Sequence, residues 1–317
     1  MHLSFVIPCY NESENVEAMH DAVAAVMEGC GFSYEMVFVD DGSRDDTFAR
    51  LKALHARSRQ YVRVLRFSRN FGKESAIYAG LSHAKGELVT LIDADLQQPP
   101  ALALEMARFL DENEDYDCVA AFQERRLESR RLSFLKKSFY KLINRMTEIE
   151  FVQGASDFRT MRRRMVDAIL SMGETNRFSK GIFSWVGFCT HYIPYRAEDR
   201  HAGASKWNTW KLFKYALDGI VSFTTMPLRL TAFAGLGTAF VSLLYTIVVV
   251  IKKLFFGIDV PGYATLAVLI LLLGGLQLFA MGILGEYLAK TYGESKCRPI
   301  YLTRTVLEPR EPDQKTN

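Results

Sequence analysis

Two long apolar runs without a charged residue constrain the fold of this chain more than any other feature. They cover Ala232–Ile251 and Tyr263–Gly285, and neither contains Asp, Glu, Lys or Arg. A helix of about 20 apolar residues spans the hydrocarbon core of a bilayer. A pair of buried core helices is the alternative, but soluble helices rarely stay uncharged for so long. The short connection between the runs predicts a transmembrane helical hairpin.

The charges around the hairpin predict its orientation. Basic residues flank both outer ends, namely Lys211, Lys214 and Arg229 before it and Lys290, Lys296 and Arg298 after it. Because basic residues favour the cytoplasmic side, we expect a multi-pass protein of the inner membrane with both termini in the cytoplasm. Lys252 and Lys253 in the connecting loop weaken this argument without reversing it. The five scattered cysteines fit reduced thiols, and the N-terminal apolar stretch is too short for a signal peptide.

The region before about residue 225 alternates expected strands with expected helices. Short apolar runs predict strands over Leu3–Pro8, Glu35–Val39, Val62–Phe67, Leu88–Ile92 and Cys118–Phe122. Helical patterns fill the intervals, over 11–29, 47–58, 73–84 and 101–113. Alternation with short connections predicts an α/β domain with a doubly wound, mostly parallel sheet.

Carboxylates cluster where the expected strands end, which is where ligands bind in such sheets. Asp93-Ala94-Asp95 follows the fourth strand, and two carboxylates at this spacing can hold Mg²⁺ or Mn²⁺ together with phosphate oxygens. The alternative is a pair of solvated turn carboxylates. Asp40 follows the second strand and can accept hydrogen bonds from a base or ribose. Alternatively, Asp40–Asp45 is an ordinary turn that caps the next helix.

Basic residues also interleave with apolar ones in two segments. Arg130–Met146 has an amphipathic helical pattern, and Lys206–Lys211 combines lysine with tryptophan. Such segments can lie on an anionic membrane surface, although a helix packed on the soluble domain is the alternative for the first. Arg125 and Arg131 are candidate contacts to an acceptor phosphate. The apolar runs assign the chain to a membrane, so we do not expect a nucleic-acid partner.

Six motifs in order resemble family 2 glycosyltransferases with a GT-A fold. They lie at Val6–Glu12, Val39–Asp45, Asn70–Lys73, Asp93–Pro100, Gln153–Arg159 and Arg200–Trp207. The last two resemble the polyprenyl-phosphate glycosyltransferases, which include dolichyl-phosphate mannose synthases and bactoprenol glucosyltransferases. The hairpin followed by Gly285-Glu286-Tyr287-Leu288 resembles the bactoprenol branch, and the resemblance extends to about Leu302.

The resemblance implies a role for several motif residues. The implied nucleotide-sugar site consists of Pro8, Tyr10, Glu12, Asp40, Lys73 and Asp93. The implied metal ligands for Mg²⁺ or Mn²⁺ are Asp93, Asp95 and Gln97. The implied catalytic residues are Asp95, Asp157 and Arg200. The implied contacts to the acceptor phosphate are Arg200, Ser205 and Lys206, in addition to Arg125 and Arg131.

By resemblance, the reaction is an inverting transfer of a hexose to polyprenyl (undecaprenyl) phosphate, for modification of cell-envelope glycans. Glucose from UDP-glucose is the family-level expectation, and a homo-oligomer is compatible with it. One alternative is a processive polysaccharide synthase, but the chain lacks the Gln-x-x-Arg-Trp motif and additional membrane helices typical of that group. Another is an inactive, membrane-tethered nucleotide-binding scaffold, which would have no need of the combined set of Asp93, Asp95, Asp157 and Arg200.

The chemistry of the expected acceptor bears on the role of Asp157. A phosphate monoester has its second pKa near 6, so the acceptor is already anionic at neutral pH and needs no strong general base. We therefore expect Asp157 to orient a ligand or a basic residue. The expected organisation is a catalytic domain over 1–204, an interfacial amphipathic segment over 205–229, two transmembrane helices (about 232–251 and 263–285) within 230–290, and a cytoplasmic tail over 291–317.

Overall fold

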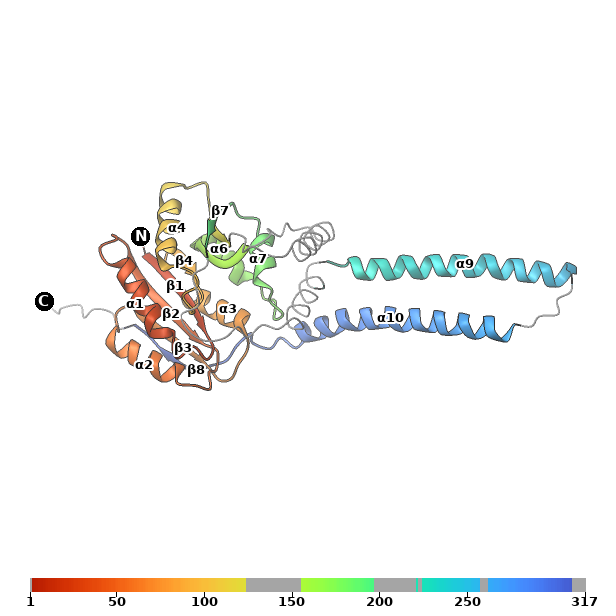
Figure 1. The fold of residues 1–317 in the computed structure, drawn as a ribbon, viewed down its shortest axis with the longest axis horizontal. Helices are drawn as coiled ribbons and strands as arrows, with labels where there is room; N and C mark the ends of the chain where they lie inside the picture. The colour runs from red at the N-terminus through yellow and green to blue at the C-terminus, as the bar shows by residue number, and fades with distance from the viewer. Residues whose placement is uncertain (1, 124–154, 197–220, 222–223, 257–261, 310–317) are drawn as a thin grey trace.

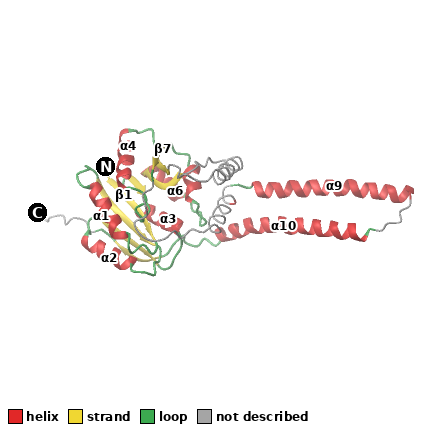
Figure 2. Cartoon of the chain, in the orientation of Figure 1, coloured by secondary structure: helices red, strands yellow, loops and turns green. Residues whose placement is uncertain are grey.

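The computed structural model describes residues 2–123, 155–196, 221, 224–256 and 262–309. They form an α/β domain from which two long helices extend (Figures 1 and 2). Several expectations lie outside the described residues. These are the basic segments 130–146 and 206–211 and the candidate phosphate-binding residues Arg125, Arg131, Arg200, Ser205 and Lys206.

A sheet of eight strands organises the described part of the α/β domain. Its strands are β1 (His2–Cys9), β2 (Ser33–Asp40), β3 (Val62–Phe67), β4 (Leu88–Leu91), β5 (Cys118–Gln123), β6 (Ala155–Arg162), β7 (Thr190–Tyr195) and β8 (Thr303–Leu307). They are arranged in the order β7-β5-β6-β4-β1-β2-β3-β8. Strands β4, β1, β2 and β3 are parallel neighbours, as are β5 and β7, whereas β6 and β8 pair antiparallel. The predicted doubly wound, mostly parallel sheet is confirmed, with two antiparallel strands that we did not expect.

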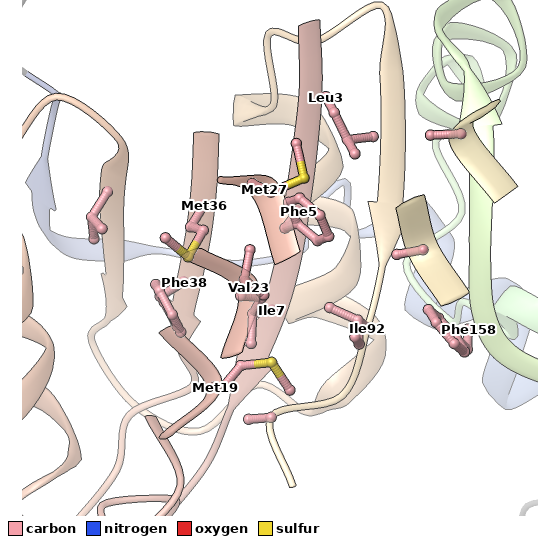
Figure 3. Packing of buried hydrophobic residues seen from close by; sticks show 14 of the residues in the cluster. Leu3, Phe5, Ile7, Met19, Val23, Met27, Met36, Phe38, Ile92 and Phe158 are labelled. Carbon is pink, nitrogen blue, oxygen red and sulfur yellow. The ribbon is translucent and has the colours of Figure 1, made fainter. Parts of the chain in front are cut away.

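Helices cover both faces of the sheet because side chains alternate along each buried strand. Leu3, Phe5 and Ile7 of β1 pack with α1 (Val16–Met27), α2 (Thr47–Arg57) and α4 (Pro100–Glu112), as Figure 3 shows in part. Val6 faces the other way, toward the core made with α3 (Lys73–His83), α6 (Arg163–Ser171) and α7 (Ser179–Trp185). Two apolar cores therefore fix the strand ends on which the candidate site is built.

The two long helices lie side by side and project away from the sheet (Figure 1). They are α9 (Met226–Phe256) and α10 (Tyr263–Ser295), both longer than the apolar runs that predict them. The segments Met226–Lys252 and Val268–Ser295 within these helices have mean hydropathies of 2.2 and 2.3. Both are long and apolar enough to cross a membrane, and their most apolar parts are not buried inside the protein. Exposure of this much apolar surface is unfavourable in water, which argues against the alternative of buried core helices.

The chain returns to the sheet after α10. Strand β8 pairs antiparallel with β3, and the ring of Tyr301 stacks on that of Phe67 at 5.0 Å. The backbone N–H of Ser68 also donates to the carbonyl of Leu302 at 2.9 Å. Part of the segment that we expected to be a tail is thus the edge strand of the α/β domain.

Candidate active site

The carboxyl ends of β1, β2 and β4 lie at one edge of the sheet, and β6 adds a residue to it from the opposite direction. Leu91 of β4 pairs with Arg159 of the antiparallel strand β6. The same register continued by two residues brings Asp93 opposite Asp157. Residues far apart in the sequence therefore meet because one strand ends where its antiparallel neighbour begins.

Lys73 joins these two aspartates. Its Nζ lies 2.7 Å from Oδ1 of Asp93 and 3.1 Å from Oδ2 of Asp157. Lys73 is the first residue of α3, so both carboxylates lie near the positive end of the helix dipole. We call Lys73, Asp93 and Asp157 the Lys73 cluster.

The charges of the Lys73 cluster shift the pKa values of Lys73 and Asp157 strongly. Burial alone would raise the pKa of Asp157, but Lys73, Lys180 and Arg159 outweigh it and lower the pKa to about 2. Burial alone would lower the pKa of Lys73, but Asp93 and Asp157 raise it well above its ordinary value. Lys73 and Asp157 are therefore both ionised near neutral pH, and Asp157 is a weak base there.

The backbone around Asp157 is held by Arg159, which is buried. The guanidinium of Arg159 donates to the carbonyl of Ser156 at 3.0 Å and lies over the ring of Phe183, 3.8 Å from its centroid. Asp157 Oδ1 is buried without a hydrogen-bond partner among the described residues. Since a buried polar atom without a partner is costly, this oxygen is a candidate contact for a ligand.

The turn after β4 holds Asp93 and Asp95 in a constrained conformation. Gln98 is buried, and its Oε1 accepts from the backbone N–H of Asp93 at 2.9 Å while its Nε2 donates to Asp93 Oδ2 at 3.3 Å. Leu96 has a φ of 61°, a left-handed conformation that is unfavourable for a leucine. Strain of this kind is common at functional sites. The sequence pattern did not reveal the role of Gln98, since its neighbour Gln97 was the expected ligand.

The expected metal ligands fit a cation site in which protein side chains supply only some of the ligands. Asp95 is half-buried, and one of its oxygens accepts from the backbone N–H of Gln97 at 3.2 Å. Among the described residues, no three His, Cys, Asp or Glu side chains are grouped as a complete metal site. Mg²⁺ is usually held by one or two carboxylates plus substrate phosphates, so this oxygen-rich donor set suits a hard cation that arrives with a nucleotide.

The turn after β2 is shaped by two buried aspartates. Asp40 Oδ1 accepts from the N–H of Ser43 at 2.9 Å, and its Oδ2 lies 3.5 Å from Arg66 Nε without a hydrogen bond. Asp41 accepts from the N–H groups of Phe71 and Gly72 at 2.6 and 2.9 Å. Burial raises the pKa of Asp41 to about 6 despite these bonds. The contacts of Asp40 among the described residues are those of a turn, as in the alternative given above. Its binding of a base or ribose stays a prediction.

Gly42 lets the β2 turn approach the loop that precedes α3. Its φ is +66°, and a Cβ built there would lie 2.4 Å from the backbone carbon of Arg69. A residue with a side chain would strain this conformation and separate the two loops. Because Lys73 follows the second loop directly, the glycine helps to place the Lys73 cluster.

The loop after β1 is tied to the β2 turn. The N–H of Asn11 donates to Ser43 Oγ and that of Glu12 donates to Thr47 Oγ1, both at 2.9 Å. Pro8 and Tyr10 in the same segment are half-buried at this edge of the sheet. The structure thus brings the expected nucleotide-binding residues to the edge that carries the Lys73 cluster, while their contacts to a nucleotide remain predictions.

Comparison with known sequences identifies the family of the chain. The profile described as "Glycosyl transferase family 2" matches residues 4–170, and "GtrB C-terminal hairpin" matches residues 226–291. The chain belongs to glycosyltransferase family 2. It is therefore a glycosyltransferase, as the motifs predict, and its long helices coincide with a hairpin known in relatives.

Similar members of family 2 match almost the whole chain. The putative glycosyltransferase CsbB of Bacillus subtilis (strain 168) is 42% identical over 99% of this chain and 95% of its own length. A bactoprenol glucosyl transferase of Shigella phage SfV is 41% identical over 96% and 98%, respectively. A prophage bactoprenol glucosyl transferase homolog of Escherichia coli (strain K12) is 40% identical over 96% and 99%.

Among solved structures, the chain is similar to glucosyl-3-phosphoglycerate synthase from Mycobacterium tuberculosis. That structure, a complex with phosphoglyceric acid, has a TM-score of 0.49 and 20% identity, and the match covers 69% of this chain and 78% of the synthase.

Proposed function

We propose that this glycosyltransferase moves a hexose from a nucleotide-sugar, with UDP-glucose as the first candidate, to a polyprenyl phosphate in the membrane. The observation that carries the proposal is the match to bactoprenol glucosyl transferases, which extends through the helical hairpin as well as the α/β domain. The exposed apolar surface of α9 and α10 supports it, because a polyprenyl acceptor is confined to a bilayer.

The reaction needs charge placement more than proton transfer. An oxygen of the acceptor phosphate attacks the anomeric carbon and forms a C–O bond, while the bond from that carbon to the diphosphate breaks and the nucleoside diphosphate leaves. Direct attack inverts the anomeric centre. Because the acceptor is already anionic, fixed positive charge near both substrates lowers the barrier. Lys73 supplies one fixed positive charge, and because Asp93 and Asp157 more than balance it, a divalent cation and further basic residues are needed for net positive charge. Asp157, whose pKa is about 2, orients Lys73 rather than acting as a base.

A divalent cation completes the proposed site. Asp95, with Asp93 and Gln97, would hold Mg²⁺ or Mn²⁺, which supplies charge for the leaving diphosphate when bound. Asp93 is already paired with Lys73, so its role is to link the cation to the Lys73 cluster. The phosphate contacts proposed for Arg125, Arg131, Arg200, Ser205 and Lys206 would add positive charge on the acceptor side.

The proposed location is the cytoplasmic membrane, with α9 and α10 spanning it. Both ends of this hairpin connect to the α/β domain, so that domain and the chain termini lie on one side. The basic residues at the outer ends of the hairpin favour the cytoplasmic side, where nucleotide-sugars are available.

The test is transfer from a panel of radiolabelled UDP-sugars to undecaprenyl phosphate, with the full-length protein in lipid nanodiscs. We expect lipid-extractable label from one donor in the presence of Mg²⁺ or Mn²⁺, and none after EDTA. Transfer that persists in EDTA would contradict the cation, and label in a growing polysaccharide would support a processive synthase. A folded protein that binds UDP-sugar but labels no lipid would contradict the proposed acceptor.

A further inference from the structure

The last turn of α10 is bonded to the loop that precedes α7. Both carboxylate oxygens of Glu294 accept from the N–H of Thr175 at 3.0 Å, and Oε2 also accepts from Thr175 Oγ1 at 3.0 Å. The N–H of Asn176 donates to Glu294 Oε1 at 3.1 Å. One side chain therefore holds the end of a membrane-spanning helix against the α/β domain.

These hydrogen bonds favour the ionised form of Glu294. Burial would raise the pKa of this carboxyl, but the donors of Thr175 and Asn176 outweigh it and lower the pKa. Hydrogen bonds to a charged acceptor are generally stronger and shorter than those between neutral groups. A single carboxylate that receives several donors fixes a loop more firmly than scattered neutral contacts would.

The loop held by Glu294 is fixed on its other side as well. The guanidinium of Arg177, which is buried, donates to the carbonyls of Met172 and Ile169 at 2.6 and 3.0 Å. It also lies over the ring of Tyr78 in α3, 4.6 Å from the centroid. The loop between α6 and α7 is thus held by the end of α10 on one side and by α6 and α3 on the other.

The first residue of α7 continues the connection to the Lys73 cluster. Ser179 is buried, and its N–H donates to Glu74 Oε2 at 2.9 Å while its hydroxyl donates to the same oxygen. Glu74 directly follows Lys73 at the start of α3. The series of hydrogen bonds and covalent bonds that starts at Glu294 thus ends at Glu74, one residue from Lys73.

The geometry points to Glu294 as a positioning residue that couples the seat of the membrane hairpin to the Lys73 cluster. This inference rests on the proposed function, since it gives the hairpin a role in turnover besides anchoring. Catalytic groups displaced by fractions of an ångström lose much of their effect, so loosening the last turn of α10 lowers the rate of the chemical step.

The experiment compares full-length variants in nanodiscs by the release of UDP from UDP-sugar in the presence of undecaprenyl phosphate. We expect Glu294→Ala to lower kcat about tenfold, with the KM for the donor and the melting temperature close to those of the wild type. Glu294→Gln keeps one carbonyl oxygen as an acceptor and should retain more activity. Glu105→Ala, which changes an exposed glutamate of α4, is the matched control and should be unaltered.

A second pair of variants distinguishes coupling from general loosening. Ser179→Ala should lower kcat, and the double variant with Glu294→Ala should be no worse than the stronger single variant, because both break one path. A kcat per folded molecule equal to wild type in Glu294→Ala, or strictly additive losses in the double variant, would overturn the inference. If the wild type transfers nothing to lipid, the proposed acceptor fails instead, and the same criteria apply to hydrolysis of the UDP-sugar.

Discussion

Two clusters of one cation with two carboxylates lie at opposite ends of the central sheet, and they differ in how far water reaches them. At the carboxyl ends of the strands, Lys73 pairs with Asp93 and Asp157, whose side chains are 42%, 31% and 17% exposed, respectively. At the amino ends, Arg63 pairs with Glu35 and Glu308, and the first two are only 2% and 6% exposed. The Lys73 cluster is therefore open to a ligand, whereas the Arg63–Glu35 pair is closed off and only Glu308 at its edge is exposed. We call the second group the closed cluster after this buried pair.

The chain itself supplies the partners of Glu35 in the closed cluster. Glu35 Oε1 accepts from Ser4 Oγ at 2.7 Å and from the N–H of Lys85 at 2.6 Å, while Oε2 faces Arg63 at 3.4 Å. These three partners come from three different segments around the sheet, so this cluster stabilises the fold. The Lys73 cluster leaves a buried oxygen of Asp157 without a partner among the described residues. Arg63 Nε is likewise buried without a partner among the described residues, so exposure, rather than charge or an unpaired atom alone, separates the candidate catalytic cluster from the structural one.

The largest expected effect that tests this comparison is on activity. Lys73→Met removes the cation between two carboxylates, and we expect kcat to fall about a thousandfold because fixed charge at the reacting centre is lost. Lys52→Met, an exposed lysine of α2, is the control and should retain full activity. Measured transfer within a few-fold of wild type would show that the open cluster does not take part in the reaction.

The closed cluster should respond in the opposite way. Arg63→Met leaves Glu35 buried without its cation, and we expect the free energy of unfolding to fall by about 3–5 kcal/mol. Denaturant titration of the purified protein measures it, and kcat per folded molecule should be unchanged. Glu308→Ala is a graded control, because that side chain is 54% exposed and its loss should cost only about 0.5 kcal/mol. A reduced kcat in folded Arg63→Met would remove the distinction between the clusters.

A smaller change sharpens the role of Asp157. Asp157→Asn should lower kcat about a hundredfold while the pH–rate profile keeps its shape, because a carboxyl that orients Lys73 does not exchange a proton in the reaction. The pKa of Asp157 is lowered to about 2, so its stabilising effect is present above its ordinary pKa and is lost as the pH falls through about 2. The stability difference between wild type and variant should therefore shrink toward that pH. Disappearance of a rate-limiting pKa in the variant would make Asp157 a general base.

The sequence predicts the parts of the site that depend on local order. Alternating strands and helices place Asp40 and Asp93 at strand ends on one edge of a parallel sheet, whatever the details of packing. The partner of Lys73 follows from no such rule, since Asp157 arrives on β6, whose antiparallel insertion beside β4 has no local signal. The same holds for Gln98, which differs from Gln97 only in the direction that a constrained turn gives its side chain.

The two long apolar helices show the same contrast between features that the sequence predicts and features that it does not. Their existence follows from long uncharged apolar runs, which have the length and composition of a membrane-spanning helix. Their junction with the α/β domain depends on Glu294 and on β8, and in the sequence these resemble an ordinary helix end and a polar tail. Contacts between distant segments are specified by tertiary packing, which no short window of residues contains.

Strand β8 also has a consequence for how the protein is made. Its partner β3 lies early in the chain, and its own residues follow the hairpin, so the edge of β3 stays unpaired while α9 and α10 are synthesised. An unpaired edge strand is open to pairing with other chains. Completion of the α/β domain thus waits for the ribosome to pass both long apolar helices.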